Sequence, residues 1–181
     1  MEKTQINGQK VVLRLMEEED TASIIKWRNH KRVSDHFIYR EAFTQEGHEN
    51  WIRTMINTGK AVQFIICEKE DLRPVGSVYY RDIDEDKKEA EYGIFIGEDD
   101  AAGKGYGSET AKLAVAYAFD KMGMERLILR VFADNVAAVK SYEKAGFAKV
   151  CDLYGVECSD GEKKDMILMD IKKGGSYESA D

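Results

Sequence analysis

The chain is poor in the residues that characterise disulfide-rich, metal-binding and multidomain proteins. Its 181 residues include three cysteines and one proline, at Cys67, Cys151, Cys158 and Pro74. The cysteines are odd in number, widely spaced and not clustered with histidine, so we expect reduced thiols and no zinc or other metal site. A single proline and the lack of a linker rich in glycine and serine favour one domain at residues 1–172, with a flexible tail at 173–181.

Long apolar stretches and basic charge are also missing. No apolar run is long enough to cross a membrane, and the start of the chain does not resemble a signal peptide. The formal net charge is −7, which disfavours nucleic acid as a partner and mildly favours a cationic ligand. We therefore expect a cytoplasmic protein with no membrane or nucleic-acid partner. The 43% hydrophobic content supports a substantial core.

What the sequence does contain is a glycine-rich loop at residues 100–108, with glycines at 103, 105 and 107. A strand-like run over 90–96 precedes the loop. A helix-like run follows it, with an apolar face made of Ala111, Ala114, Val115, Ala118, Phe119 and Met122. Free amides and the helix dipole at such a helix start predict a phosphate or pyrophosphate site, although an ordinary strand-to-helix turn is the alternative. The spacing matches neither a P-loop nor the dinucleotide fingerprint, so another phosphate-bearing ligand is expected.

Hydrophobic patterns and turn residues predict the order of the elements. Strands are predicted at 10–16, 62–68, 74–82, 89–96, 126–132, 147–156 and 164–171, and helices that end near residues 30, 59, 123 and 145. Residues 1–8 are expected to form a loose leader, and 31–43 to be irregular. This order indicates an α/β (α+β) fold, a mixed sheet with helices on both faces. The crossover through the glycine loop implies one parallel pair of strands.

Two motifs resemble those of the GNAT superfamily of acyl-CoA-dependent N-acetyltransferases. Residues 102–108 (AGKGYGS) resemble the loop Gln/Arg-x-x-Gly-x-Gly/Ala, although the Gln/Arg position holds Ala102. Residues 135–147 (NVAAVKSYEKAGF) resemble the helix Asn-x-x-Ala-x-x-x-Tyr-x-x-x-Gly-Phe. Both motifs at this spacing, in this strand order, make the resemblance specific over residues 9–172.

The resemblance implies the GNAT fold, a mostly antiparallel sheet of about seven strands in which one parallel pair splays apart. The pantetheine arm of acetyl-CoA would enter that gap and pair with the backbone of Ile94 and Ile96. Backbone amides from Ala102 to Gly107 would hold its pyrophosphate, and Asn135 would lie beside the pantetheine or simply cap its helix. The implied cofactor-binding residues are Ile94, Phe95, Ile96, Ala102, Gly103, Lys104, Gly105, Tyr106, Gly107, Ser108 and Asn135.

The reaction implied is direct attack of a primary amine on the thioester in a ternary complex, with no metal. Tyr142 is the candidate general acid for the leaving thiolate, and a core aromatic role is its alternative. An amide of Ile94 or Phe95 would stabilise the developing oxyanion. Glu91 is the first candidate for the general base. The other candidates are His36, His48 and Glu41.

The acceptor site is predicted from the segments around residues 26–30 (KWRNH) and 48–52 (HENWI). They are similar to the branch that acetylates amino-sugar nucleotides, so we predict an amino sugar or its nucleotide as the acceptor. Polyamine and ribosomal-protein N-terminal branches are alternatives, and a non-catalytic acyl-CoA-binding module is an alternative of another class. The predicted acceptor residues are Trp27, Arg28, Asn29, His36 and Tyr80. A homodimer is also expected, since dimerisation is common in this superfamily.

Overall fold

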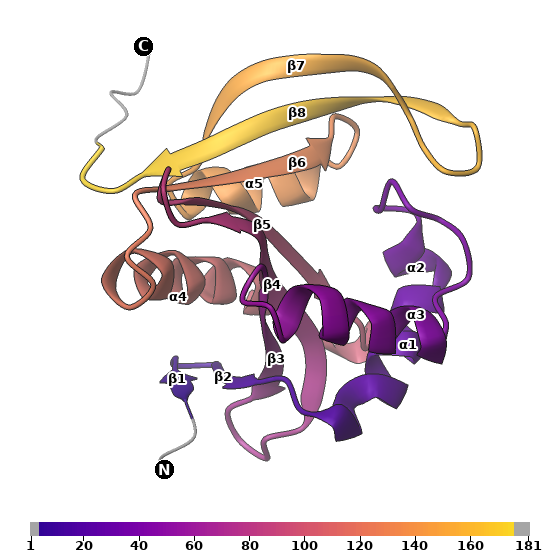
Figure 1. Cartoon of the computed structure of the whole chain (residues 1–181), viewed down its shortest axis with the longest axis vertical. Coiled ribbons are helices and arrows are strands. Elements are labelled where there is room, and N and C mark those ends of the chain that lie inside the picture. The colour runs from indigo at the N-terminus through magenta and orange to yellow at the C-terminus, as the bar shows by residue number, and fades with distance from the viewer. Residues whose placement is uncertain (1–3, 176–181) are drawn as a thin grey trace.

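The computed structural model describes residues 4–175 (Figure 1). The strands are β1 (Gln5–Asn7), β2 (Val11–Leu15), β3 (Val62–Glu68), β4 (Pro74–Asp84), β5 (Glu89–Ile96), β6 (Arg126–Phe132), β7 (Ala148–Glu157) and β8 (Lys163–Lys172). The helices are α1 (Thr21–Asn29), α2 (Lys31–Ser34), α3 (Gln45–Trp51), α4 (Tyr106–Asp120) and α5 (Val136–Lys144), with a π-helical turn at Ile52–Ile56 and 3₁₀ turns at Glu18–Asp20 and Asp99–Ala101. Within the described range, no helix is both long and apolar enough to cross a membrane.

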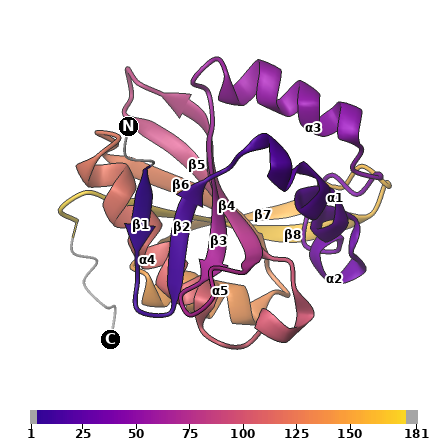
Figure 2. The ribbon, with the colours of Figure 1, turned by 90° about the horizontal axis from the view of Figure 1, so that it is seen from below.

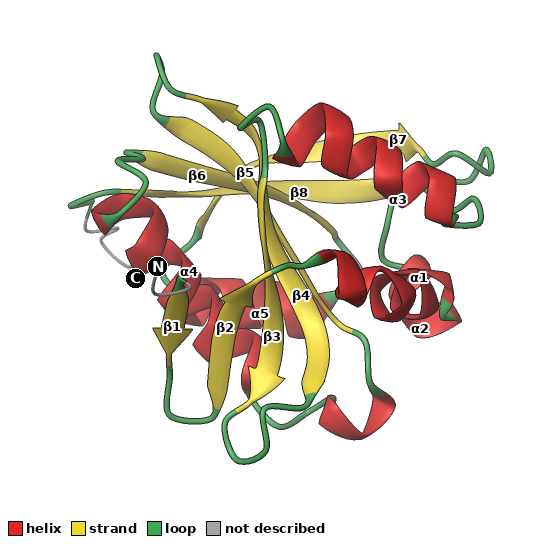
Figure 3. Cartoon of the chain, turned by 60° about the horizontal axis from the view of Figure 1, so that its bottom comes forward, coloured by secondary structure: helices red, strands yellow, loops and turns green. Residues whose placement is uncertain are grey.

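The strands form a sheet in the order β1-β2-β3-β4-β5-β6-β8-β7. Every neighbouring pair is antiparallel except β5 and β6, which are parallel. Figure 3 shows the strong twist of the sheet, with β6, β8 and β7 running across the direction of β1 to β4. The predicted fold class, a mixed and mostly antiparallel sheet with one parallel pair, is confirmed.

The start of the described chain differs from the prediction. Gln5–Asn7 pairs with β2 as an eighth strand, where the sequence predicts a loose leader and about seven strands. Three residues are too few to show a period-two pattern, and the strand forms through backbone pairing at the sheet edge. At the other end, Lys173 donates a backbone hydrogen bond to Glu125, and residues 176–181 of the predicted tail lie outside the described residues.

The segment 31–43, predicted to be irregular, begins with the one-turn helix α2. His30 caps this helix, because its Nδ1 accepts a hydrogen bond from the backbone amide of Arg32 at 3.3 Å. A single helical turn is shorter than the window in which a 3.6-residue period can be recognised.

Successive side chains along a strand point to opposite faces of the sheet and so pack in two separate cores. Phe64 and Ile66 of β3 pack in the larger core with α4, whereas Ile65 and Cys67 pack in the smaller core with α1. Figure 2 shows α4 and α5 on one side of the sheet and α1, α2 and α3 on the other. The helices therefore cover both faces, as predicted.

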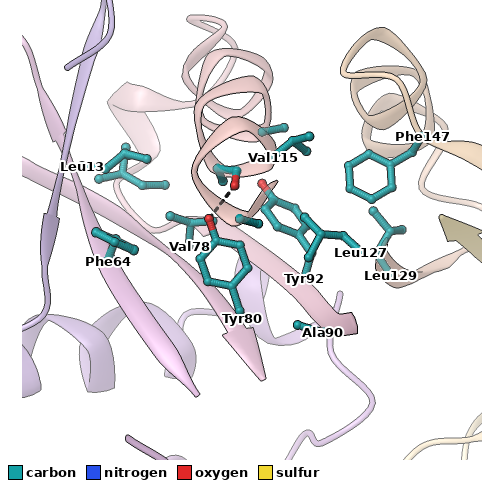
Figure 4. Close-up of a cluster of buried hydrophobic side chains, with 14 of the residues drawn as sticks. Leu13, Phe64, Val78, Tyr80, Ala90, Tyr92, Val115, Leu127, Leu129 and Phe147 are labelled. Atoms are coloured by element: carbon teal, nitrogen blue, oxygen red, sulfur yellow. Dashed lines mark hydrogen bonds between the residues drawn. The ribbon is translucent and has the colours of Figure 1, made fainter. Parts of the chain in front are cut away.

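Helix α4 lies close to the sheet because its inner face consists of small residues. Ala111, Ala114 and Ala118 are fully buried, as their spacing predicts. Tyr80 of β4 is also fully buried beneath this helix, and its hydroxyl donates a 2.6 Å hydrogen bond to the carbonyl oxygen of Ala114 (Figure 4). Tyr80 is therefore a core residue, and its assignment to the acceptor site is wrong.

The helix starts that frame the site are capped as the sequence predicts. Thr44 Oγ1 accepts a hydrogen bond from the amide of Gly47 at 3.0 Å, and Asn135 Oδ1 accepts one from the amide of Ala138 at 3.3 Å. Helix α4 is preceded by Gly105, whose φ of +82° is a conformation that residues with a Cβ rarely adopt.

Glu109 joins the first turn of α4 to the N-terminal hairpin. Its carboxylate accepts hydrogen bonds from the backbone amides of Gln9, Lys10 and Val11 at 2.8, 2.8 and 2.9 Å. The glycine loop is thus held from two sides, by the sheet that leads into it and by the β1–β2 turn beside it.

Candidate active site

The parallel strands β5 and β6 separate after three paired residues. Glu89–Glu91 pairs with Arg126–Ile128, and beyond that point β5 continues to Ile96 with no strand partner on this side among the described residues, although Arg32 donates a 3.0 Å hydrogen bond to the carbonyl of Ile96. The amide of Gly97 bonds the carbonyl of Val75 at 2.7 Å across the other edge of β5. Because backbone groups alternate along an antiparallel ladder, those of Ile94 and Ile96 face the gap, and the amide of Phe95 faces β4. Of the two oxyanion candidates, only Ile94 therefore directs its amide into the gap.

The glycine loop beyond this gap has free backbone donors. No amide from Gly103 to Ser108 donates a hydrogen bond to any residue in the described part of the chain. The amide of Ala102 is different, since it bonds the carbonyl of Asp99 at 3.3 Å and is not free for a ligand. Nothing lies within 4 Å of a Cβ built on Gly103 or Gly107, so the surface beside these amides is open. The loop fits a diphosphate group, because its donors point together at a helix start.

The side chains of the loop make contacts of their own. The Tyr106 hydroxyl donates to Glu68 at 3.0 Å, and the Lys104 ammonium lies 3.6 Å from the same carboxylate. Ser108 and Ser141 join α4 to α5 through a 2.9 Å bond between their hydroxyl oxygens. The loop therefore offers its backbone, and not these hydroxyls, to a ligand.

A cavity of about 780 Å³ opens from the gap toward α1, α2 and α3. It brings together many of the predicted site residues from distant parts of the chain. Those that line it are Arg28, His36, His48, Glu91, Ile94, Phe95, Ile96, Gly107, Asn135 and Tyr142. A volume of this size suits a small-molecule substrate together with part of a cofactor.

Tyr142 of α5 forms part of the cavity wall. It packs edge-on against Tyr92 and Phe147, with ring centroids 6.1 and 6.0 Å away. No described residue exchanges a hydrogen bond with its hydroxyl, and burial raises the pKa of Tyr142 above the ordinary value. The phenol therefore keeps its proton near neutral pH and has it free to donate.

Glu91 of β5 lies between two arginines that sequence reasoning missed. Its carboxylate accepts hydrogen bonds from Arg81 at 3.3 Å and from Arg130 at 3.1 Å, and its side chain is 15% exposed. Both arginines line the cavity. Their positions opposite Glu91 follow from the register of β4 and the divergence of β6, which no local pattern reports.

Asn135 contacts both the helix that it caps and the acceptor side. Its Nδ2 lies 3.3 Å from the Nδ1 of His36, while its Oδ1 caps α5. His36 is exposed at the cavity wall. These two predicted residues, one assigned to the cofactor and one to the acceptor, are thus in contact at the cavity wall.

Two further acceptor assignments are wrong. Trp27 is 1% exposed in the smaller core, and its indole N–H donates to Glu98 at 2.7 Å. Asn29 bonds both backbone groups of Phe43, so it shapes the α2–α3 loop and does not line the cavity. Both residues flank Arg28 in sequence, but successive helix positions point about 100° apart, and only Arg28 faces the cavity.

The alternative bases differ in position. His48 is 1% exposed, with its Nδ1 3.0 Å from the Thr21 hydroxyl, and burial lowers the pKa of His48, which keeps it neutral. Its Nε2 is buried without a hydrogen-bond partner among the described residues. Glu41 accepts a hydrogen bond from Tyr39 and does not line the cavity.

Comparison with known proteins gives a consistent picture. A family model for the acetyltransferase (GNAT) domain matches residues 10–148. An uncharacterized N-acetyltransferase, p20, of Bacillus licheniformis is 25% identical over 169 residues, which cover 91% of this chain and 94% of the relative. The acetyltransferase PseH of Campylobacter jejuni is 28% identical over 124 residues, 68% of this chain and 74% of the relative. An uncharacterized protein of Methanocaldococcus jannaschii is 28% identical over 143 residues, and the match spans only 28% of that longer protein.

The fold has a close counterpart among solved structures. Spermidine N-acetyltransferase of Vibrio cholerae, in complex with CoA and spermine, superposes with a TM-score of 0.83 at 22% identity, covering 91% of this chain and 96% of that one. The family match covers more than half of this chain and includes the diverging strands, the glycine loop and the helix that carries Tyr142. The chain therefore belongs to the GNAT family and is an acetyl-CoA-dependent N-acetyltransferase.

Proposed function

We propose that this enzyme moves the acetyl group of acetyl-CoA directly onto the primary amine of an amino sugar or amino-sugar nucleotide. The observation that carries the proposal is the continuity of three features. The glycine loop with its free amides reaches the cavity at Gly107, and the edge of β5 that has left β6 and the residue Tyr142 line the same cavity. The amine can enter the same cavity while acetyl-CoA is bound and attack the thioester directly. The proposed reaction therefore does not pass through a covalent acyl-enzyme.

In this proposal the backbone of the chain binds the cofactor. Amides from Gly103 to Ser108 hold the diphosphate, the edge of β5 at Ile94 and Ile96 pairs with the pantetheine, and Asn135 lies beside it. The bound acetyl-CoA supplies the activated acetyl group. Ala102 contributes no donor, because its amide is already bonded within the loop.

In this proposal, the residues around the cavity transfer protons and stabilise the charge that develops during the reaction. Tyr142 holds a proton at its Oη and donates it to the leaving sulfur. The amide of Ile94 is a preorganised donor for negative charge on the carbonyl oxygen. Glu91 accepts the proton of the amine, directly or through water, and is our candidate base because it is the one carboxylate among the described residues that line the cavity.

A polyamine is the second candidate acceptor. The net charge of −7 favours a cationic substrate, and the fold matches a spermidine N-acetyltransferase. The chemistry of the cavity favours the amino sugar instead, above all one that carries a phosphate or nucleotide, since four arginines and one carboxylate line the cavity. The charges that line the cavity affect binding more than the net charge of the chain does, because salt largely screens charges that lie more than about 10 Å from the ligand.

The experiment that tests the function is a panel of amines with acetyl-CoA, in which released CoA is measured with dithiobisnitrobenzoate. The panel contains amino sugars and their phosphates or nucleotides, spermidine, and peptides that begin with Ala or Ser. A protein blank corrects for Cys151, which is exposed. We expect turnover to be highest with an amino sugar or its derivative. Tight binding of acetyl-CoA without turnover of any amine would instead favour a non-catalytic binding module.

A further inference from the structure

Four arginines but only one carboxylate, Glu91, line the cavity among the described residues. Three of the four arginines have partners. Arg81 and Arg130 share Glu91. Arg32 donates to the carbonyl oxygens of Ile96 and Gly97 and to the carboxylate of Asp99. These contacts satisfy the three guanidinium groups within the fold.

Arg28 is the exception. It donates no hydrogen bond to any residue within 4–175 and forms no ion pair with a carboxylate in that range, and its Nε is buried without a partner. Burial lowers the pKa of Arg28, but a guanidinium still carries its charge at neutral pH. The cavity wall therefore holds a partly buried cation with no counter-ion among residues 4–175, which is costly unless a ligand provides one.

Two aromatic rings hold this guanidinium. Its carbon lies 3.7 Å from the ring centroid of Phe37 and 4.8 Å from that of Phe43. Rings against a guanidinium plane stabilise the cation and orient it, and they leave its N–H edge free. A planar fork with unused donors is the geometry that binds phosphate or carboxylate through two parallel hydrogen bonds.

The α2–α3 loop that carries the two rings is itself anchored. The amide of Arg40 donates to the Ser159 hydroxyl at 2.7 Å, and the amide of Ser159 donates to the Ile38 carbonyl at 2.9 Å. Arg40 also pairs with Asp160 and Glu162 of the β7–β8 turn. The loop is thus tied to the far hairpin, so the position of Arg28 is preset before any ligand binds.

We propose that Arg28, clamped between Phe37 and Phe43, is the specificity residue that binds an anionic group, a phosphate or carboxylate, carried by the acceptor amine. This inference rests on the proposed acetyl transfer and narrows its acceptor. A sugar phosphate or sugar nucleotide supplies such a group, whereas a polyamine brings only further positive charge to a wall that already holds Arg28 and Arg81.

The test compares glucosamine with glucosamine 6-phosphate and glucosamine 1-phosphate, with spermidine as the cationic probe. We expect wild type to prefer at least one of the phosphates to glucosamine by about tenfold or more in kcat/KM, the range for a charge-assisted contact. Arg28→Met should lower kcat/KM for the preferred phosphate about tenfold more than kcat/KM for glucosamine, which removes the preference, and Arg28→Lys should restore part of it. Arg53→Met, at an exposed arginine outside the cavity, is the matched control and should match wild type.

Binding separates this inference from the acetylation that it assumes. Isothermal titration of each glucosamine phosphate into the protein saturated with CoA should show binding that Arg28→Met weakens about tenfold or more. If no amine is acetylated but this Arg28-dependent binding persists, the anion site stands and the proposed acceptor reaction fails. Three results would overturn the anion site and leave acetyl transfer standing. They are equal kcat/KM values for glucosamine and its phosphates, an equal loss of kcat/KM for glucosamine and its phosphates in Arg28→Met, or spermidine as the best acceptor. A rise in the KM for acetyl-CoA alone would also overturn it, because it would assign Arg28 to the cofactor.

Discussion

At the scale of single residues, the sequence predicts where the motif residues lie in the fold but not which residues surround them. Tyr142 and Asn135 stand at fixed places in a helix motif, so their positions on and before α5 can be predicted before the fold is known. The partners of Glu91 come from two other strands and become visible only when the sheet is assembled. Trp27 and Asn29 are predicted as acceptor residues from the same segment as Arg28, and the rotation of the helix directs each of them elsewhere.

The role of Tyr142 can be tested by Tyr142→Phe. Its hydroxyl has no partner in the described structure, so its loss removes a proton donor and little else. We expect kcat to fall by about a hundredfold or more, with the KM for acetyl-CoA within about twofold. Because burial raises the pKa of Tyr142 above 10.0, wild-type activity should not decline through ionisation of this residue below pH 10. Tyr154→Phe, at an exposed tyrosine, is the control. Unchanged turnover in Tyr142→Phe would rule out the acid role.

The proposed base is tested by Glu91→Gln, which retains the size of the side chain and removes its charge. We expect kcat/KM for the amine, measured by CoA release at neutral pH, to fall by about a hundredfold. Glu41→Gln, at the alternative acid that does not line the cavity, should keep the wild-type kcat/KM. An unchanged kcat/KM in Glu91→Gln would transfer the base role to His36 or to water.

At the scale of elements, the helix starts are predictable because short-range chemistry determines them. Thr44, Asn135 and the glycine loop are all visible in sequence as a side-chain cap or a positive-φ residue. The long-range contacts that each helix N-terminus makes cannot be predicted from the sequence. Glu109 looks like an ordinary first-turn acid, yet it bonds backbone amides about a hundred residues earlier in the chain.

Glu109→Ala tests this fastening. Three backbone donors lose their acceptor, so we expect the free energy of unfolding to fall by about 1–3 kcal/mol, which lowers Tm by several degrees in a chain of this size. Glu46→Ala, at an exposed first-turn glutamate of α3, should cost less than about 1 kcal/mol. Chemical denaturation of both variants measures the difference. Equal losses in the two would show that Glu109 acts only on its own helix.

At the scale of the whole molecule, charge acts through local pairs. The formal net charge of −7 suggests a cationic ligand, whereas the cavity is lined mainly by arginines. Acidic side chains are spread over loops and strand ends, where many pair with nearby bases, and so the net value says little about the site. The homodimer and the cytoplasmic location stay predictions.

Stability in acid provides a measurement at this scale. Burial alone would raise the pKa of Asp20, but hydrogen bonds from Arg14 and the amide of Glu17 outweigh it and hold the pKa below the ordinary 3.8. A lowered carboxyl pKa stabilises the fold above the unfolded value, and this contribution is lost as the pH falls through the folded pKa. Asp20→Asn should therefore lower the free energy of unfolding by about 1–3 kcal/mol at pH 7, with a smaller difference from wild type below pH 3.8. Urea titrations at pH 7 and in acid check this, and a constant difference at every pH would contradict it.

The sequence by itself determined the fold class, the one parallel crossover, the glycine loop before a helix and the helix that carries Tyr142, because each depends on local periodicity, turn chemistry or a motif of fixed spacing. Only the tertiary structure decided which side chains share the cavity. Strand register placed Arg81 and Arg130 on Glu91, the rotation of α1 selected Arg28 over its neighbours, and α4 covered Tyr80. These are contacts between residues far apart in the chain, and the geometry that creates them exists only when the sheet and both helical layers have come together.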